Sequence, residues 1–261
     1  VNTLNWMEVP SPTAITHARE LLSKLGALDD KGAITPHGKA MNSYGLHPRL
    51  SHMMLKAKEL NLTYEASLLA TLLSEKDIFK SNYNSVDVVE RVEALNEVAN
   101  GKKVSHSVNI AQCHTLLKNA KRMEPKQKSK LNTSLLGVLL AFAYPERIAK
   151  QRQTNTTDYL MSSGKGAKLH AEDHLAQERF LVIADLNAKA THAHIYKAIA
   201  ISQADIETHL TSLIRTSQEV DWNEEEQRVE VREALRLGSL LLKERPLKSS
   251  NNPEVTDLLL E

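Results

Sequence analysis

The sequence predicts a multidomain α+β protein in which a winged helix is followed by a helical bundle and then by an OB-like small β-barrel with a β-rich extension. Residues 11–49 combine a capped amphipathic helix, a short hairpin and a second helix. Apolar stretches of helical period then continue as far as residues 144–145. Beyond that point the apolar runs shorten and Gly turns separate them, which is typical of a small barrel.

The winged helix is predicted at residues 1–48. Ser11-Pro12 suits the N-cap and first position of a helix. Apolar residues then recur every three or four positions, at Ile15, Ala18, Leu22 and Leu25. Gly26 is placed to end this helix, and the turn residues 30–32 separate two short strands. Thr35 then caps a second helix, so the order helix, hairpin, helix predicts a winged helix.

The helical bundle is predicted at residues 49–144. Apolar residues repeat at helical spacing in five stretches that are separated by short polar loops. The predicted helices are 48–60, 64–74, a helix capped by Ser85 and ended by Gly101, 104–123 and 126–143.

The OB-like β domain is predicted at residues 145–216 and the extension at 217–261. A hairpin is predicted around the turn 162–166, and the continuous apolar run 180–184 is typical of a strand that is buried on both faces. The other predicted elements are a strand at 194–201, a helix that starts at Ser202, strands at 220–222 and 229–231, and one strand at 235–242 around Gly238.

Composition describes an ordinary water-soluble protein. The 261 residues are 25% charged and 41% hydrophobic, with a net charge of +1. No apolar run approaches the length of a membrane span, no leader of basic and apolar residues occurs, and Cys113 is the single cysteine. We therefore expect a cytoplasmic protein without a membrane partner. Because the chain opens on Val1 rather than Met, we also expect it to be cut from something larger.

The charge is unevenly distributed along the chain. Between residues 118 and 168 there are eleven Lys or Arg against three acids, a local charge of +8. Between residues 203 and 261 there are seven basic residues against thirteen acids, a local charge of −6. A basic middle beside an acidic end favours a polyanionic partner for the middle, with a solvated helical face as the alternative.

Nucleotide hydrolysis is not expected of this chain. A phosphate-binding loop needs a Gly-Lys pair followed by Ser or Thr, whose hydroxyl holds the metal. The chain has three such pairs, and the residues that follow them are Ala40, Lys103 and Gly166. We therefore predict no catalytic residue and no cofactor within this stretch.

A metal site is the main enzymatic alternative. His170 and His174 are four apart, a spacing that lets two histidines on a helix share one ion. Glu172 stands one position too late for the metalloprotease motif. A third ligand would have to come from elsewhere, such as His192 or His194. We predict surface histidines here and no metal.

Nucleic-acid contacts are predicted near the barrel. A Lys flanked by glycines lets both the backbone and the ammonium group approach a phosphate, and OB barrels bind single strands along basic grooves. Aromatic residues are scarce at 4%, so contact with the backbone is favoured over base stacking. The candidate residues are Arg147, Lys150, Arg152, Lys165 and Lys168.

Short motifs along the chain resemble a known family. LGALD at 25–29 and GAIT at 32–35 resemble the winged helix that follows the second motor domain of DEAH-type RNA helicases. Further motifs are similar to the bacterial HrpB branch of that family, namely HPRL at 47–50, SEKD at 74–77, AYPER at 143–147, YLMSSGKGA at 159–167, VIADL at 182–186 and LGSL at 237–240.

This resemblance implies the C-terminal region of an ATP-dependent RNA helicase, with its two RecA-like motor domains absent. It implies that the bundle is a ratchet-like helicase-associated domain and that residues 217–261 begin an HrpB-specific extension. ATP and Mg²⁺ would then belong to the parent protein. The partners implied are the N-terminal motor domains of the same chain, single-stranded RNA, and an activator protein on the OB-fold in some relatives. Lys165 stands where the family's Gly-flanked turn carries Arg or Lys.

Two other functions remain open at this point. A DNA-binding regulator would place the helix that begins at Thr35 in the major groove, although His37, Lys39 and Asn42 form a thin recognition surface. An interaction scaffold would instead use the acidic C-terminal part to dock a basic partner.

Overall fold

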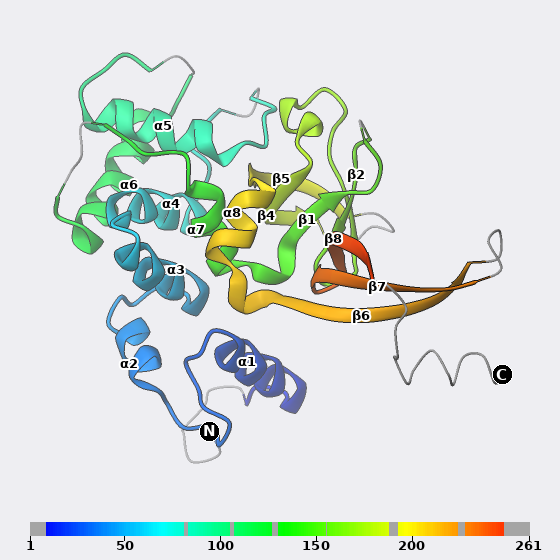
Figure 1. Cartoon of the computed structure of the whole chain (residues 1–261). Coiled ribbons are helices and arrows are strands. Elements are labelled where there is room, and N and C mark those ends of the chain that lie inside the picture. The colour runs from blue at the N-terminus through cyan, green and yellow to red at the C-terminus, as the bar shows by residue number, and fades with distance from the viewer. Residues whose placement is uncertain are drawn as a thin grey trace.

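A computed structural model describes residues 9–80, 83–104, 107–126, 130–154, 156–187, 193–223 and 228–247. The winged helix forms a separate lobe, the bundle and the barrel lie side by side, and a three-stranded sheet extends away from the barrel (Figure 1). These parts confirm the predicted fold class. In the described part of the chain, no helix is long and apolar enough to cross a membrane.

The winged helix contains α1 (Pro12–Lys24) and α2 (Pro36–Asn42). As predicted, the Ser11 side chain caps α1 by accepting a hydrogen bond from the Ala14 N–H at 3.2 Å. Thr35 caps α2 in the same way. The wing itself is a single antiparallel bridge between Leu28 and Ile34. Because α1 has no buried residue, this lobe has only a small core.

Among the described residues the bundle contains five helices, as predicted. Its two most apolar helices, α4 and α7, bury most of their residues, and α7 also packs against the barrel strands (Figure 1). The helices are α3 (Pro48–Glu59), α4 (Thr63–Ser74), α5 (Val88–Ala99), α6 (Ile110–Met123) and α7 (Leu136–Ala143).

Three predicted helix starts in the bundle were wrong. Helix α6 begins at Ile110 rather than 104, because Val108 instead bridges to Phe79 in an extended conformation. Helix α7 begins at Leu136 rather than 126. The Asn132 side chain accepts hydrogen bonds from Ser134, and such local bonds compete with a helix. The cap of α5 is Asp87, not Ser85.

The barrel is closed, with the strand order β1-β2-β3-β5-β4. All neighbouring pairs are antiparallel except β3 with β5, which are parallel. The predicted hairpin and the strand that is buried on both faces are both present. The strands are β1 (Ile148–Gln151), β2 (Asp158–Met161), β3 (Gly166–Lys168), β4 (Phe180–Asn187) and β5 (Ala193–Ala200).

Short helical elements surround the barrel. The 3-10 turn η1 (Pro145–Arg147) leads into β1, and η2 (His174–Gln177) lies between β3 and β4. Helix α8 (Gln203–His209) and the turn η3 (Thr211–Leu213) follow β5, and the Ser202 side chain caps α8 as predicted.

A separate antiparallel sheet follows, with the order β6-β7-β8. It contains β6 (Ile214–Asn223), β7 (Arg228–Leu237) and β8 (Leu240–Leu247). The single strand predicted at 235–242 was wrong, because β7 ends and β8 begins at a turn containing Gly238. This turn lies on the barrel, where the Ser239 N–H donates to the Ser162 carbonyl at 2.9 Å. Strand β6 runs through residues 216–217, where we predicted the boundary between the OB-like domain and the extension. This division into domains stays a prediction.

One apolar core joins the bundle, one outer side of the barrel and the second sheet. Phe180 and Val182 of β4 pack outward into it, together with Leu240 and Leu242 of β8. The barrel interior forms a second core. Because helices and the second sheet cover the β1–β4 side of the barrel, its open side is the one formed by β2 and β3.

Candidate nucleic-acid interface

Two of the five predicted cations lie on the covered side of the barrel. The Lys150 ammonium donates to the Leu241 carbonyl of β8 at 2.6 Å, and burial lowers the pKa of this lysine. The Arg147 guanidinium donates to the Ala184 carbonyl at 2.8 Å and lies 4.9 Å from the centre of the Tyr144 ring. Both side chains therefore hold neighbouring elements to the barrel.

Two other predicted cations lie in one row across the open side, which we call the barrel row. The Arg152 N–H donates to the Asp158 carbonyl at 2.9 Å, Asp158 pairs with Lys168, and Lys168 pairs with His194 of β5. These four residues thus follow one another from the end of β1 across β2, β3 and β5. The Lys168 ammonium and the Asp158 carboxylate are 3.8 Å apart and about half exposed. The barrel row therefore contains a guanidinium, an ammonium, an imidazole and a carboxylate group.

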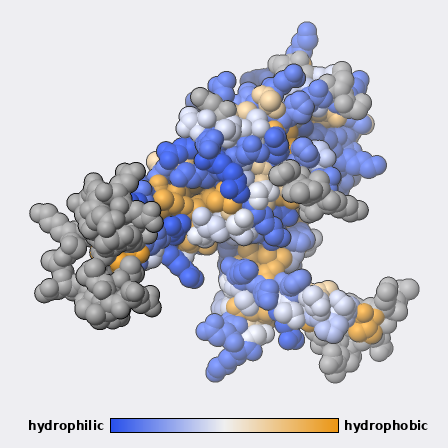
Figure 2. Space-filling view, turned by 90° about the vertical axis from the view of Figure 1, so that its right-hand side faces the viewer, coloured by the Kyte–Doolittle hydropathy of each residue, from blue (hydrophilic) through white to orange (hydrophobic). Residues whose placement is uncertain are grey.

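A shallow cavity of about 460 Å³ lies beside the barrel row. Its floor contains Gly166, where an added Cβ would lie 3.7 Å from the Arg152 guanidinium. Lys165, the fifth predicted cation, is exposed but lies in the β2–β3 turn, next to the second sheet. Arg152 and Lys168 thus lie on either side of Asp158 in the barrel row, whereas Lys165 lies outside the row, in the turn before Gly166. Figure 2, which shows the right-hand side of Figure 1, has hydrophilic residues at the surface together with smaller apolar patches.

Sequence reasoning did not assign His194 or Tyr196 to this face, and considered His194 only as a metal ligand. Both are exposed, whereas Ile195 between them is buried in the barrel. The alternation of the segment AHIYKAIA at 193–200 is a signal that could have placed them on the outer face.

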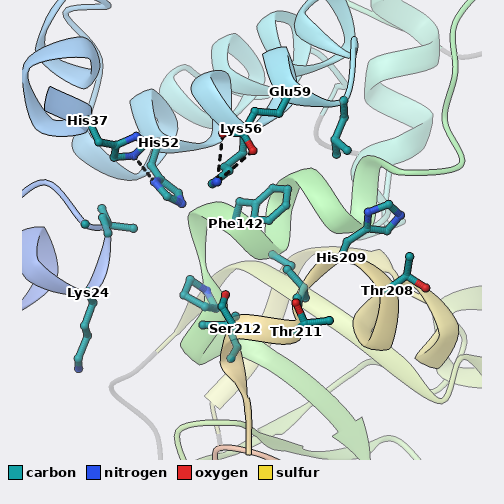
Figure 3. A pocket seen from close by; sticks show the side chains of 17 residues that line it. Lys24, His37, His52, Lys56, Glu59, Phe142, Thr208, His209, Thr211 and Ser212 are labelled. Atoms are coloured by element: carbon teal, nitrogen blue, oxygen red, sulfur yellow. Dashed lines mark hydrogen bonds and ion pairs between the residues drawn. The ribbon is translucent and has the colours of Figure 1, made fainter.

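The winged-helix lobe is separated from the rest of the molecule by a cleft, which we call the interlobe cleft. One part, of about 900 Å³, lies between α1 and the second sheet and is lined by Lys24, Arg215 and Ser217 among others. A second part, of about 640 Å³, lies between α2, α3, α7 and η3 (Figure 3). Arg49 closes one edge, because its guanidinium binds the Glu146 carboxylate at 2.7 Å.

A pair of histidines lines the interlobe cleft where α2 packs against α3. His37 of α2 and His52 of α3 point toward one another, with Nε2 and Nδ1 2.8 Å apart (Figure 3). Burial, followed by the nearby charges of His37 and Lys56, lowers the pKa of His52 to about 4. Burial also lowers the pKa of His37. Both rings are therefore neutral at pH 7, and one donates to the other. His37 is thus turned away from the surface that a DNA-reading helix would need.

This pair makes the stability of the chain depend on pH. Because the folded chain favours neutral His52, protons bind more tightly to the unfolded chain, and stability falls as the pH drops from 6.5 toward about 4. We expect wild type to lose roughly 1–2 kcal/mol more than His52→Gln between pH 7.5 and 5, measured by urea unfolding. His174, whose pKa is raised beside Asp87, is the same in both proteins. Equal pH dependence in both would contradict the assignment.

No three His, Cys, Asp or Glu residues are grouped closely enough to hold a metal ion within the described ranges. His174 instead lies 3.1 Å from the Asp87 carboxylate. His192, the other proposed ligand, lies outside the described residues.

Comparisons with known proteins find similar sequences and similar structures. Residues 18–46 match the family described as "Helicase associated domain (HA2), winged-helix". The chain is 23% identical over 98% of its length to the ATP-dependent RNA helicase HrpB of Escherichia coli (strain K12). Crystal structures of the E. coli DExH-box NTPase HrpB and of the E. coli DEAH/RHA helicase HrpB superpose with TM-scores of 0.73 and 0.71. The chain matches the C-terminal region of HrpB.

The match to HrpB confirms the resemblance that the sequence motifs predicted. The two solved HrpB structures are each 24% identical and cover 96% and 97% of this chain, so they show the fold. The ATP-dependent RNA helicase DEAH13 of Arabidopsis thaliana is 50% identical over 46 residues, which is 18% of this chain and 4% of that protein. The chain spans about 30% of the length of HrpB.

Proposed function

We propose that this chain is the accessory region of a DEAH-type ATP-dependent RNA helicase and that it binds and guides single-stranded RNA for the motor. The observation that carries the proposal is the closed barrel with two exposed cations, Arg152 and Lys168, on its open side, in a chain that matches HrpB along 98% of its length. Single strands are bound by a positively charged groove that follows their phosphates.

The motor domains of the same chain are the proposed partner of the winged-helix lobe. The lobe supports this role, because α1 carries an apolar stripe yet buries none of its residues. Binding and hydrolysis of ATP with Mg²⁺ belong to those motor domains in this proposal. We propose no catalytic group in this chain.

The test is the salt dependence of RNA binding. For single strands, each neutralised phosphate contributes about 0.7 to the slope of log K against log salt. We expect Arg152→Ala/Lys168→Ala to weaken binding of a fluorescent oligouridine and to reduce this slope by roughly 1.4 relative to wild type. Fluorescence anisotropy across a salt series measures both quantities.

Lys39→Ala is the matched control, because Lys39 is an exposed lysine of α2, remote in sequence from the barrel. It should leave the slope unchanged. Binding that does not depend on salt would refute the proposal. Duplex DNA bound more tightly than single strands, and weakened by Lys39→Ala, would instead support a winged-helix regulator. Capture of a basic protein without any RNA binding would support a scaffold.

A further inference from the structure

We propose that Tyr196 is a base-stacking platform, so that the open side of the barrel contacts the bases of the strand as well as its phosphates. This inference rests on the proposed function and extends it to an aromatic residue. It also revises the sequence-based expectation that backbone contact is favoured over base stacking.

The exposure of Tyr196 sets it apart from the other aromatic side chains. Its side chain is 53% exposed, and among the aromatic side chains that the structure describes it is the only exposed one. The other described aromatic side chains are buried or partly buried within the chain. Tyr159, for example, is fully buried in the barrel, where its hydroxyl donates to backbone carbonyls of 175 and 178. An exposed tyrosine ring on the outer face of a strand is accessible for stacking against a partner.

The backbone at Tyr196 is irregular. Ile195 pairs with Leu186 and Lys197 pairs with Asp185, so Tyr196 is the extra residue of a β-bulge in β5. Bulges redirect side chains and are common at the rims of barrels and beside functional sites. Lys197, the residue after Tyr196, anchors the bulge to the bundle. Its side chain is only 18% exposed, and its ammonium lies 3.9 Å from the Asp77 carboxylate.

The position of Tyr196 relative to the barrel row suits a nucleotide. His194 belongs to the row and is two residues before Tyr196, about 7 Å away along an extended strand. Both side chains are exposed, and the Lys168 and Arg152 cations continue the row on the neighbouring strands. A phosphate on these cations would leave its base within reach of the ring. Because every base has a π-face, such stacking is tolerant of sequence.

The experiment separates the bases from the phosphates. The probes are an oligouridine of about ten nucleotides and a strand with the same charge whose sugars carry no bases. We expect Tyr196→Ala to weaken binding of the oligouridine roughly 5- to 100-fold, which corresponds to the stacking of one base, and to change binding of the abasic strand by less than about 2-fold. Tyr196→Phe, which keeps the ring, should bind both strands like wild type.

Ile110→Ala is the matched control, because Ile110 is an apolar residue of the bundle that is 48% exposed. It should change neither affinity. Equal weakening of both strands by Tyr196→Ala would overturn the stacking role, and so would no change in either strand. In both cases the proposed function would stand if Arg152→Ala/Lys168→Ala still reduces the salt slope. If wild type binds neither strand, the proposed function fails and the inference fails with it.

Discussion

Gly137→Val should lower the free energy of unfolding by about 3 kcal/mol. Gly137 lies in α7 where this helix touches the end of β5. A Cβ at this position would overlap the carbonyl oxygen of Ala200 and lie 3.1 Å from the Ile201 Cβ. The carbonyl is backbone, so it cannot rotate away as a flexible side chain could. The bundle and the barrel would have to move apart, and the common core that joins them would lose contact.

Urea unfolding followed by circular dichroism measures this change. Gly166→Ala is the matched control, because a Cβ there would meet its nearest atoms at 3.7 and 3.9 Å, which are ordinary contacts. We expect the midpoint of the control to stay close to that of wild type. If Gly137→Val unfolds at the same urea concentration as wild type, α7 and β5 do not meet at backbone distance, and the packing of bundle on barrel described above is wrong.

Elements defined by local signals could be predicted from the sequence. The caps at Ser11 and Thr35 and the hairpin around 162–166 depend on residues within a few positions of one another. The wrong helix starts depend on distant partners or on competing local bonds. The segment before α6 is extended because Val108 bridges to Phe79, about thirty positions earlier, and a local periodicity cannot reveal that pairing.

The candidate site could be predicted only in part, for the same reason. Charge and sequence proximity selected Lys150 together with Lys168. The structure separates them, because the partner of Lys150 is the Leu241 carbonyl, 91 residues away. His194 enters the barrel row through the parallel pairing of β3 with β5, and Tyr196 lies in a β-bulge of β5. Neither of these tertiary features has a signature in composition or charge.

Arg91→Ala should destabilise the junction between bundle and barrel by about 3 kcal/mol. The Arg91 side chain is 6% exposed, and its guanidinium donates to the Asp77 carboxylate at 2.9 Å and to the Asp87 carbonyl at 2.8 Å. It also lies 5.0 Å from the centre of the Phe79 ring. Removing it leaves a cavity, takes one hydrogen-bond donor from the Asp87 carbonyl and leaves a carboxylate with one fewer cation. Because Asp77 is 30% exposed, we expect the lower end of the range for broken buried pairs.

Two further variants separate charge from geometry, each measured by urea unfolding. Arg91→Lys keeps the charge but cannot make both hydrogen bonds or stack its head on Phe79, so we expect an intermediate loss of about 1–2 kcal/mol. Asp77→Asn with Arg91→Ala should cost less than the sum of the single changes, because the two side chains share one contact. Strict additivity would contradict the pairing.

Since Asp77 also lies beside Lys197, we expect Arg91→Ala to speed hydrogen exchange at the bulge that carries Tyr196.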